Sequence, residues 1–230
     1  YRFSIEWARI EPVEGQFDEK EIDHYRKMLE FCRANEVEPI VTLHHFTSPK
    51  WLIEKGGWED ERTIDSFAKY CKYLVEELGD LLNYVVTINE ANMSLQVAAI
   101  SERYKRQMMA KANVEGTAQI GMNFNTMMEN MAKQKAENVE VFGVETPQTF
   151  VSARTPEGDI LVMKAHNAAT KAMKEIKPEL KVGLSLSLHD VQAVAGGEDK
   201  ALKEWYEEFL HYLPYIKNRS EEHTSELQSR

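Results

Sequence analysis

The spacing of apolar residues along the chain predicts strands and helices in alternation. Short apolar or alternating stretches predict four strands, at residues 1–5, 40–43, 84–88 and 182–188. Apolar residues three and four positions apart predict four helices, at residues 18–35, 64–78, 161–176 and 199–212. Because a helix follows each strand, at about forty residues per unit, the pattern predicts an α/β fold with parallel strands.

The rhythm breaks over residues 92–158, where we expect a helical excursion after the third strand. Six of the ten methionines lie between Met108 and Met131. A methionine-rich surface can be an adaptable contact site, but buried packing is the more common use and the interpretation that we favour. A loop is expected at residues 44–58, which are rich in His, Thr, Pro and Gly.

Both ends of the sequence look cut. Strand-like alternation begins at Tyr1 without an initiator methionine, so we expect that a preceding segment is missing. Residues 218–230 have Leu227 as their only aliphatic side chain and cannot offset the entropy of ordering. Within them, RSEEHTSELQS resembles the translation of a common DNA-sequencing adapter. We therefore expect one partial domain at residues 1–217 and a disordered, artefactual tail at residues 218–230.

The chain is acidic, with 38 Asp and Glu against 28 Lys and Arg and a formal charge of −10. Binding to nucleic acid or to an anionic membrane needs concentrated positive charge, so we expect neither as a partner. No apolar run approaches the about 20 residues of a membrane helix. The two cysteines, Cys32 and Cys71, exclude a disulfide scaffold and favour a reducing compartment, so we expect a cytoplasmic protein.

The sequence contains no phosphate-binding loop. Neither a GxGxxG after the first strand nor a Walker loop is present, so we expect no nucleotide cofactor. Four strand–helix units are too few for a closed eight-stranded barrel, but they fit half of one.

The polar residues that follow the second and third predicted strands are the first candidates for chemistry, because parallel α/β folds place their sites at these strand ends. His44, His45 and Phe46 follow the second strand, and Asn89 and Glu90 follow the third. A carboxylic acid held protonated at a strand end can donate a proton to a leaving oxygen. Acids also favour helix N-termini, so Glu90 as the cap of the next helix stays open at this point.

The two adjacent histidines invite a metal interpretation that we do not favour. Neighbouring residues on an extended segment point to opposite faces, so His44 and His45 cannot easily bind one ion. No HExxH, CxxC or carboxylate-rich loop supplies further ligands. We therefore expect no metal site, and we expect His44 to be a hydrogen-bonded core residue.

Three motifs in order resemble glycoside hydrolase family 1, the family of β-glucosidases and 6-phospho-β-glycosidases. They are YRFSIEWARIEP, EPIVTLHHFTSPKWL followed by GGW, and LGDLLNYVVTINEAN. They are similar to the second, third and fourth strands of the family's barrel, and KVGLSLSL is similar to the fifth. The resemblance spans about residues 1–217 and is weakest over residues 101–158.

The resemblance implies an incomplete (β/α)8 barrel and a retaining β-glycosidase without cofactor or metal, acting on a small carbohydrate. The family uses two glutamates about 5–5.5 Å apart, one as acid/base and one as nucleophile. The motif match places the acid/base on Glu90. Asn89 would hold the sugar hydroxyl next to the anomeric carbon, His45 another hydroxyl, and Phe46 stands at an aromatic position. Arg2 would point into the barrel beside the nucleophile and keep it ionised.

Departures from the family pattern set limits on these expectations. The ENG motif that carries the nucleophile is absent from the 230 residues, so we expect them to be inactive alone. Ala91 replaces the usual proline after the acid, and Ser187 stands where many members have asparagine.

Three hypotheses follow. The first is a β-glycosidase fragment, which the intact Asn89–Glu90 pair favours. The second is a non-catalytic carbohydrate-binding pseudoenzyme of the same fold, and the third is an unrelated α/β protein with coincidental motifs. Sugar specificity and oligomeric state have no signal in these residues.

Overall fold

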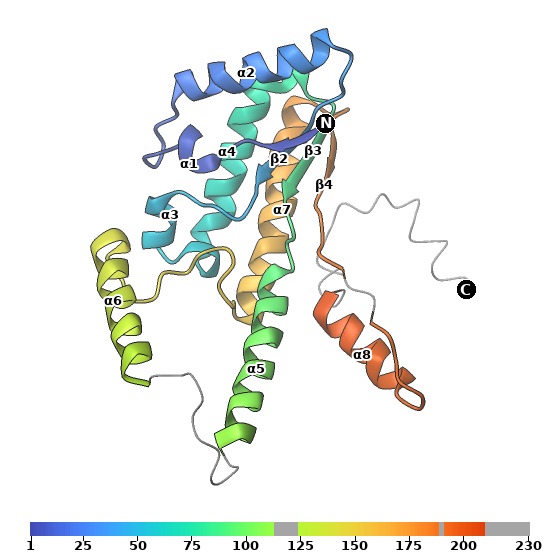
Figure 1. The fold of residues 1–230 in the computed structure, drawn as a ribbon. Helices are drawn as coiled ribbons and strands as arrows, with labels where there is room; N and C mark the ends of the chain where they lie inside the picture. The colour runs from blue at the N-terminus through green and yellow to red at the C-terminus, as the bar shows by residue number, and fades with distance from the viewer. Residues whose placement is uncertain (113–123, 189–190, 210–230) are drawn as a thin grey trace.

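The computed structural model describes residues 1–112, 124–188 and 191–209 (Figure 1). Four strands form one sheet in the order β1-β2-β3-β4, and each neighbouring pair is parallel. The strands are β1 (Arg2–Ser4), β2 (Ile40–His44), β3 (Tyr84–Ile88) and β4 (Lys181–Gly183). The predicted parallel α/β arrangement is confirmed. The end of the last predicted helix, at residues 210–212, and the tail at residues 218–230 lie outside the described residues.

The register of the sheet places an apolar row on one face. The opposite face carries the polar side chains of Arg2, Ser4 and Thr42 beside the apolar Ile40 and Val86, and we call it the polar face. Phe3 pairs with Val41, Val41 with Val85, and Val85 with Val182, which makes a continuous apolar row across the four strands. Side chains alternate between the two faces of a strand, so Arg2 lies on the face opposite to Phe3. There its Nε donates to Thr42 Oγ1 at 2.8 Å, as expected if both share the polar face.

The structure contains helices of very different length between and after the strands. They are α1 (Trp7–Ile10), α2 (Glu19–Ala34), α3 (Lys50–Glu54), η1 (Gly57–Glu59), α4 (Arg62–Leu78), η2 (Gly79–Leu81), α5 (Met93–Ala112), α6 (Phe124–Phe142), α7 (Pro156–Ile176) and α8 (Glu198–Phe209). The helices α4 and α7 pack against each other and lie behind the strands in Figure 1. In the same view, α5 and α6 extend away from the sheet.

The core lies between the sheet and the helices α4 and α7. The predicted stripe of α4 is buried at Phe67, Cys71, Leu74 and Leu78. The ring of Tyr70 stacks on Trp7 at 5.0 Å, and its hydroxyl lies 3.0 Å from the carbonyl oxygen of Leu43 and 3.2 Å from that of Ile5. The helix α4 therefore fixes the ends of β1 and β2, next to which the candidate site lies.

Local signals that were missed explain where the predicted boundaries differ. The expected loop at residues 44–58 contains α3 and η1, because α3 buries its apolar residues Trp51, Leu52 and Ile53. The helix α7 begins five residues earlier than predicted. Its start has an N-cap, Thr155, which accepts from the Gly158 N–H, and a proline at the first helical position, Pro156.

The fourth strand is shorter than the apolar alternation of residues 182–188 predicts. Only Lys181–Gly183 pairs with β3, so regular pairing stops opposite Val86, two residues before β3 ends at Ile88. Beyond β4, Ser185 still exchanges backbone hydrogen bonds with the end of β3 and its turn. Its N–H donates to the carbonyl of Ile88 at 3.1 Å, and its carbonyl accepts from the Ala91 N–H at 3.0 Å.

The excursion at residues 92–158 contains α5 and α6. Among the clustered methionines, only the side chain of Met131 lies within the described part, and it is exposed. The buried packing expected of this cluster therefore stays a prediction, as does the division into residues 1–217 and 218–230. None of the helices in the described ranges combines the length and the apolar character that crossing a bilayer requires.

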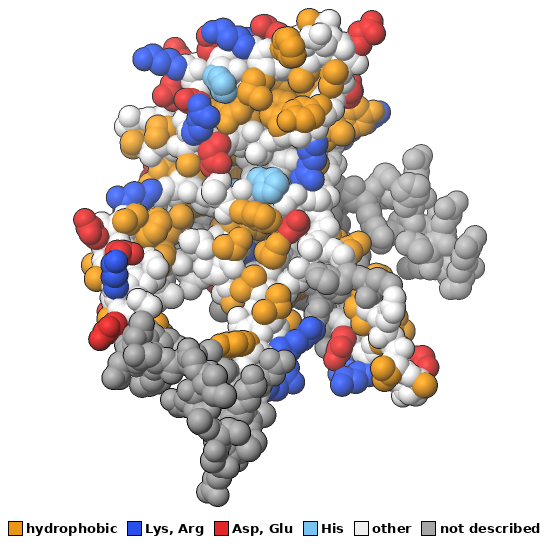
Figure 2. Space-filling view, viewed as in Figure 1, with side chains coloured by type: hydrophobic (Ala, Val, Ile, Leu, Met, Phe, Trp, Pro, Cys, Tyr) orange, Lys and Arg blue, Asp and Glu red, His pale blue; other side chains and the backbone are white. Residues whose placement is uncertain are grey.

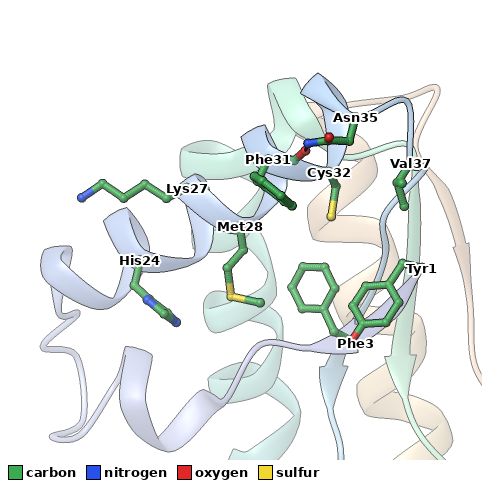
Figure 3. Close-up of a pocket in the computed structure, with 9 residues that line it drawn as sticks. All are labelled: Tyr1, Phe3, His24, Lys27, Met28, Phe31, Cys32, Asn35 and Val37. Carbon is green, nitrogen blue, oxygen red and sulfur yellow. Dashed lines mark hydrogen bonds between the residues drawn. The ribbon is translucent and has the colours of Figure 1, made fainter.

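An apolar groove lies between α2 and the start of β1, away from the strand ends that carry the candidate site. Its lining includes Tyr1, Phe3, Met28, Phe31 and Cys32. Figure 3 shows these side chains pointing toward one another, and Figure 2 shows hydrophobic side chains gathered below α2. The groove is open on the surface, since Tyr1 is 72% and Phe31 70% exposed.

Candidate active site

The candidate acid lies in the turn that follows β3. Asn89 is buried, and its backbone N–H donates to the carbonyl of His44 at 2.9 Å, which extends the pairing between β2 and β3. Glu90 is half-buried and has a φ of 48°, in the left-handed region that non-glycine residues rarely adopt. The turn therefore aims the Glu90 side chain in a direction that a continued strand would not allow.

Backbone hydrogen bonds on both sides hold this turn. The Glu90 N–H donates to Ser185 Oγ at 3.2 Å, and the Glu90 carbonyl accepts from the Met93 N–H at 2.9 Å. The first turn of α5 is thus bonded by the backbone of Glu90. Within the described residues, no hydrogen bond from that helix reaches the Glu90 carboxylate, so the carboxylate is available to a ligand.

The Asn89 side chain is fixed by two donors. Its Oδ1 accepts from Arg2 Nη2 at 2.6 Å and from Ser185 Oγ at 3.1 Å. A guanidinium can only donate, so the atom facing Arg2 has to be the amide oxygen. The Asn89 NH2 group is therefore directed away from Arg2 and can donate to a hydroxyl of a ligand. The structure brings the predicted residues Arg2 and Asn89 together.

His45 and Phe46 follow β2, the strand next to Glu90's own. His45 is exposed, and its ring meets that of Phe46 edge to face, with centroids 4.8 Å apart. Phe46 is half-buried and has a φ of 71°. It stacks on the buried ring of Phe150 at 6.3 Å. An exposed imidazole beside an aromatic face can bind one polar and one apolar side of a sugar ring.

His44 points the other way, as the sequence predicted, and is a core residue. It is 1% exposed, and its Nε2 lies 2.9 Å from Ser48 Oγ. The rings of Phe150 and Trp58 lie 4.6 and 4.9 Å from its own. Burial lowers the pKa of His44 to about 3, so the ring is neutral at physiological pH. The described residues hold no group of three or more His, Cys, Asp or Glu side chains that could bind a metal.

Three residues that shape the site were not predicted from the sequence: Ser185, Phe150 and Arg154. Ser185 lies in a predicted strand, yet its hydroxyl bridges Asn89 and Glu90. Phe150 and Arg154 precede α7 in a segment without periodicity, and the Arg154 guanidinium reaches the carbonyl of Ala91. The only signal for that segment was the Thr155-Pro156 helix start. This helix start shows where the segment before α7 ends, but it does not show what Phe150 and Arg154 contact.

The geometry provides for both binding and proton transfer. At the ends of two neighbouring parallel strands lie a carboxyl group, an oriented amide and an imidazole, with an aromatic ring beside them. Such a set can bind several hydroxyl groups of a sugar and present a carboxyl group to one oxygen of it.

Comparison with known proteins identifies the chain's relatives. The family described as Glycosyl hydrolase family 1 matches residues 1–155. The human cytosolic beta-glucosidase is 43% identical over 95 residues, which cover 40% of this chain and 20% of that protein. A beta-glucosidase of an Agrobacterium species is 31% identical over 169 residues, which cover 73% of this chain and 33% of that protein.

Solved structures extend the likeness over nearly the whole chain. The crystal structure of the beta-glycosidase BGL167 is 37% identical with a TM-score of 0.70, covering 93% of this chain and 47% of that one. The apo structure of a beta-glucosidase, 1317, is 28% identical with a TM-score of 0.71, covering 95% and 48%. The chain thus spans less than half of the length of these proteins. The predicted incomplete (β/α)8 barrel is confirmed, and a coincidental set of motifs is excluded.

Proposed function

The chain belongs to glycosyl hydrolase family 1, and on that premise we propose that it is part of a retaining β-glycosidase. Its reaction is the hydrolysis of O-glycosidic bonds in small β-glucosides or related sugars by double displacement. The observation that carries the proposal is the Glu90 carboxylate, half-buried and without a hydrogen-bond partner in the described residues, beside the amide of Asn89 that Arg2 orients.

The proposed reaction has two steps with one proton transfer at Glu90 in each. In the first, a carboxylate outside these 230 residues attacks the anomeric carbon. Glu90 gives its proton to the leaving oxygen as the glycosidic bond breaks. In the second, Glu90 takes a proton from water, which attacks the anomeric carbon and releases the sugar and the nucleophilic carboxylate. The 230 residues alone provide Glu90 without that second carboxylate, so we expect them not to hydrolyse glycosides.

The surrounding residues bind and orient the sugar. The Asn89 NH2 group donates to the hydroxyl next to the anomeric carbon, because its oxygen is already held by Arg2 and Ser185. His45 bonds another hydroxyl, and Phe46 supplies an apolar face. Arg2 is the first residue of β1, but its cationic side chain reaches Asn89 beyond the end of β3. There it would favour the ionised form of a nearby nucleophile.

The names of the relatives bear on the substrate and the location that we propose. They include beta-glucosidases and a 6-phospho-beta-galactosidase from Clostridium acetobutylicum, 40% identical over 91 residues. We propose a small β-glycoside as substrate. A cytoplasmic location is supported by the human relative, which is named as cytosolic.

The test is hydrolysis of 4-nitrophenyl β-glucoside by the complete protein encoded around this sequence. The proposal predicts turnover in which the sugar released first is the β-anomer. Proton NMR during the reaction identifies the anomer. Formation of the α-anomer would contradict the retaining mechanism. Binding of glucose without any turnover across a panel of β-glycosides would support the non-catalytic alternative instead.

A further inference from the structure

A buried ion pair lies directly behind the turn that carries Glu90. Arg154 Nε and Asp159 Oδ1 are 3.1 Å apart, and the two side chains are 1% and 3% exposed. Removing two charges from water is costly, and an apolar pair of similar volume is often as stable. Stability alone therefore does not account for this ion pair, and its position next to the Glu90 turn suggests another role.

The guanidinium of Arg154 is directed at the residue that follows Glu90. Its Nη2 donates to the carbonyl of Ala91 at 3.0 Å. From the opposite side, the Ala91 N–H donates to the carbonyl of Ser185 at 3.0 Å. Ala91 is thus held through both of its backbone polar groups. A proline at this position would lack the N–H, so the second of these bonds depends on the alanine.

The same guanidinium reaches the wall of the sugar site. It lies over the ring of Phe150, 4.7 Å from the centroid, and its Nη1 donates to the carbonyl of Phe150. Phe150 in turn stacks on Phe46. Arg154 therefore connects the turn after β3 with the loop after β2. Asp159 orients Arg154 and itself accepts from Ser94 in the first turn of α5.

Left-handed backbone at a non-glycine residue persists where the surroundings impose it. Glu90 has this conformation, and Arg154 and Ser185 hold the backbone of the next residue, Ala91. We infer that Arg154, held by Asp159, is a positioning residue that sets the direction of the Glu90 carboxyl group during proton transfer. This inference rests on the proposed function. Arg154 acts through Ala91 and does not touch the substrate.

The experiment compares two β-glucosides in the complete protein. Phenol is a poor leaving group that needs a proton, whereas 2,4-dinitrophenolate leaves without one. The variant Arg154→Met/Asp159→Asn removes both charges, so that none is left buried and unpaired. We expect kcat/KM for phenyl β-glucoside to fall about tenfold or more, and kcat/KM for the dinitrophenyl compound to change less than about threefold.

Two further variants keep the result decisive. Arg154→Lys retains the charge but loses the fork that reaches Ala91, and it replaces the double variant if a thermal melt shows that the latter is unfolded. Leu78→Ala, a core change on α4, is the matched control that destabilises the protein without contact with the turn. We expect it to leave the ratio of the two kcat/KM values unchanged.

Glu90→Ala in the same assay separates the two hypotheses. Suppose that Glu90→Ala selectively lowers hydrolysis of the phenyl glucoside. If the folded Arg154 variant then shows no loss, or an equal loss for both substrates, the positioning role is wrong and the proposed function stands. If Glu90→Ala itself shows no selectivity between the substrates, the acid/base assignment fails. A selective loss in both variants supports the inference.

Discussion

Arg2 donates to the side-chain oxygen of Asn89 across 2.6 Å, although 87 positions separate the two residues in the chain. The contact joins β1 to the end of β3 and crosses the polar face of the sheet. The contact occupies the amide oxygen of Asn89, so the NH2 group is the part of the side chain that can bond a ligand. The orientation of this amide is thus set by a residue from the first strand.

This arrangement predicts that Asn89→Ala loses binding to one sugar hydroxyl. We expect kcat/KM for an aryl β-glucoside to fall about 10- to 100-fold, the value of one hydrogen bond that strengthens toward the transition state. The matched substrate is the 2-deoxy-β-glucoside, on which Asn89→Ala and the native protein should differ little. An equal loss on both substrates would show that Asn89 does not contact that hydroxyl.

Arg2→Met is predicted to act through Asn89. Without the cation, the Asn89 amide can rotate, so we expect Arg2→Met to lower kcat/KM for the aryl β-glucoside as well. In the double variant Arg2→Met/Asn89→Ala, we expect a loss in free energy that is smaller than the sum of the two single losses. Additive free energies in the double-mutant cycle would contradict the coupling. Circular dichroism of each variant provides the control for folding.

Two glycines with similar backbone angles are predicted to respond differently to alanine. Gly15 and Gly57 have φ values of 74° and 56°, but only at Gly57 would a Cβ meet another group, the carbonyl oxygen of Gln148 at 2.2 Å. Gly15→Ala should cost about 1–2 kcal/mol from backbone strain alone. Gly57→Ala should cost about 1–3 kcal/mol more, because the segment that leads to Phe150 has to move. Urea unfolding compares them, and equal losses would refute the close approach.

His44 predicts a loss of stability in acid. Its pKa is lowered to about 3 in the folded protein, against 6.5 when unfolded. The stability tied to its neutral form is therefore complete above pH 6.5 and is lost as the pH falls toward 3. Between pH 7 and pH 5 this amounts to about 2 kcal/mol. His44→Gln should reduce the pH dependence of the unfolding free energy by that amount. An unchanged pH dependence would mean that His44 is not buried as a neutral ring.

Elements with a strong local pattern were predictable from the sequence. The helix α4 has an unbroken apolar stripe and ends before Gly79, so its packing face and its end followed from spacing alone. The strand β3 matched the predicted residues 84–88 because its apolar run is bounded on both sides by polar residues. The opposite placement of His44 and His45 followed from the alternation of a strand.

Contacts between distant segments were not predictable in this way. Residues 184–188 alternate like a strand, but regular pairing with β3 stops at Gly183, opposite Val86, and a local pattern does not show where pairing with a distant strand ends. Arg154 contacts a residue 63 positions away, from a segment with no periodicity. The roles of Glu90, Asn89 and His45 came from a resemblance rather than from spacing, and they stay predictions until their chemistry is measured.

The central claim is that Glu90 gives its proton to the leaving oxygen when the glycosidic bond breaks. The most direct measurement is kcat/KM of Glu90→Ala in the complete protein for phenyl and 2,4-dinitrophenyl β-glucosides. The account predicts a fall of about 10²- to 10⁴-fold for the phenyl compound and little change for the dinitrophenyl compound, because only the first leaving group needs a proton. Undiminished hydrolysis of phenyl β-glucoside by Glu90→Ala would contradict it.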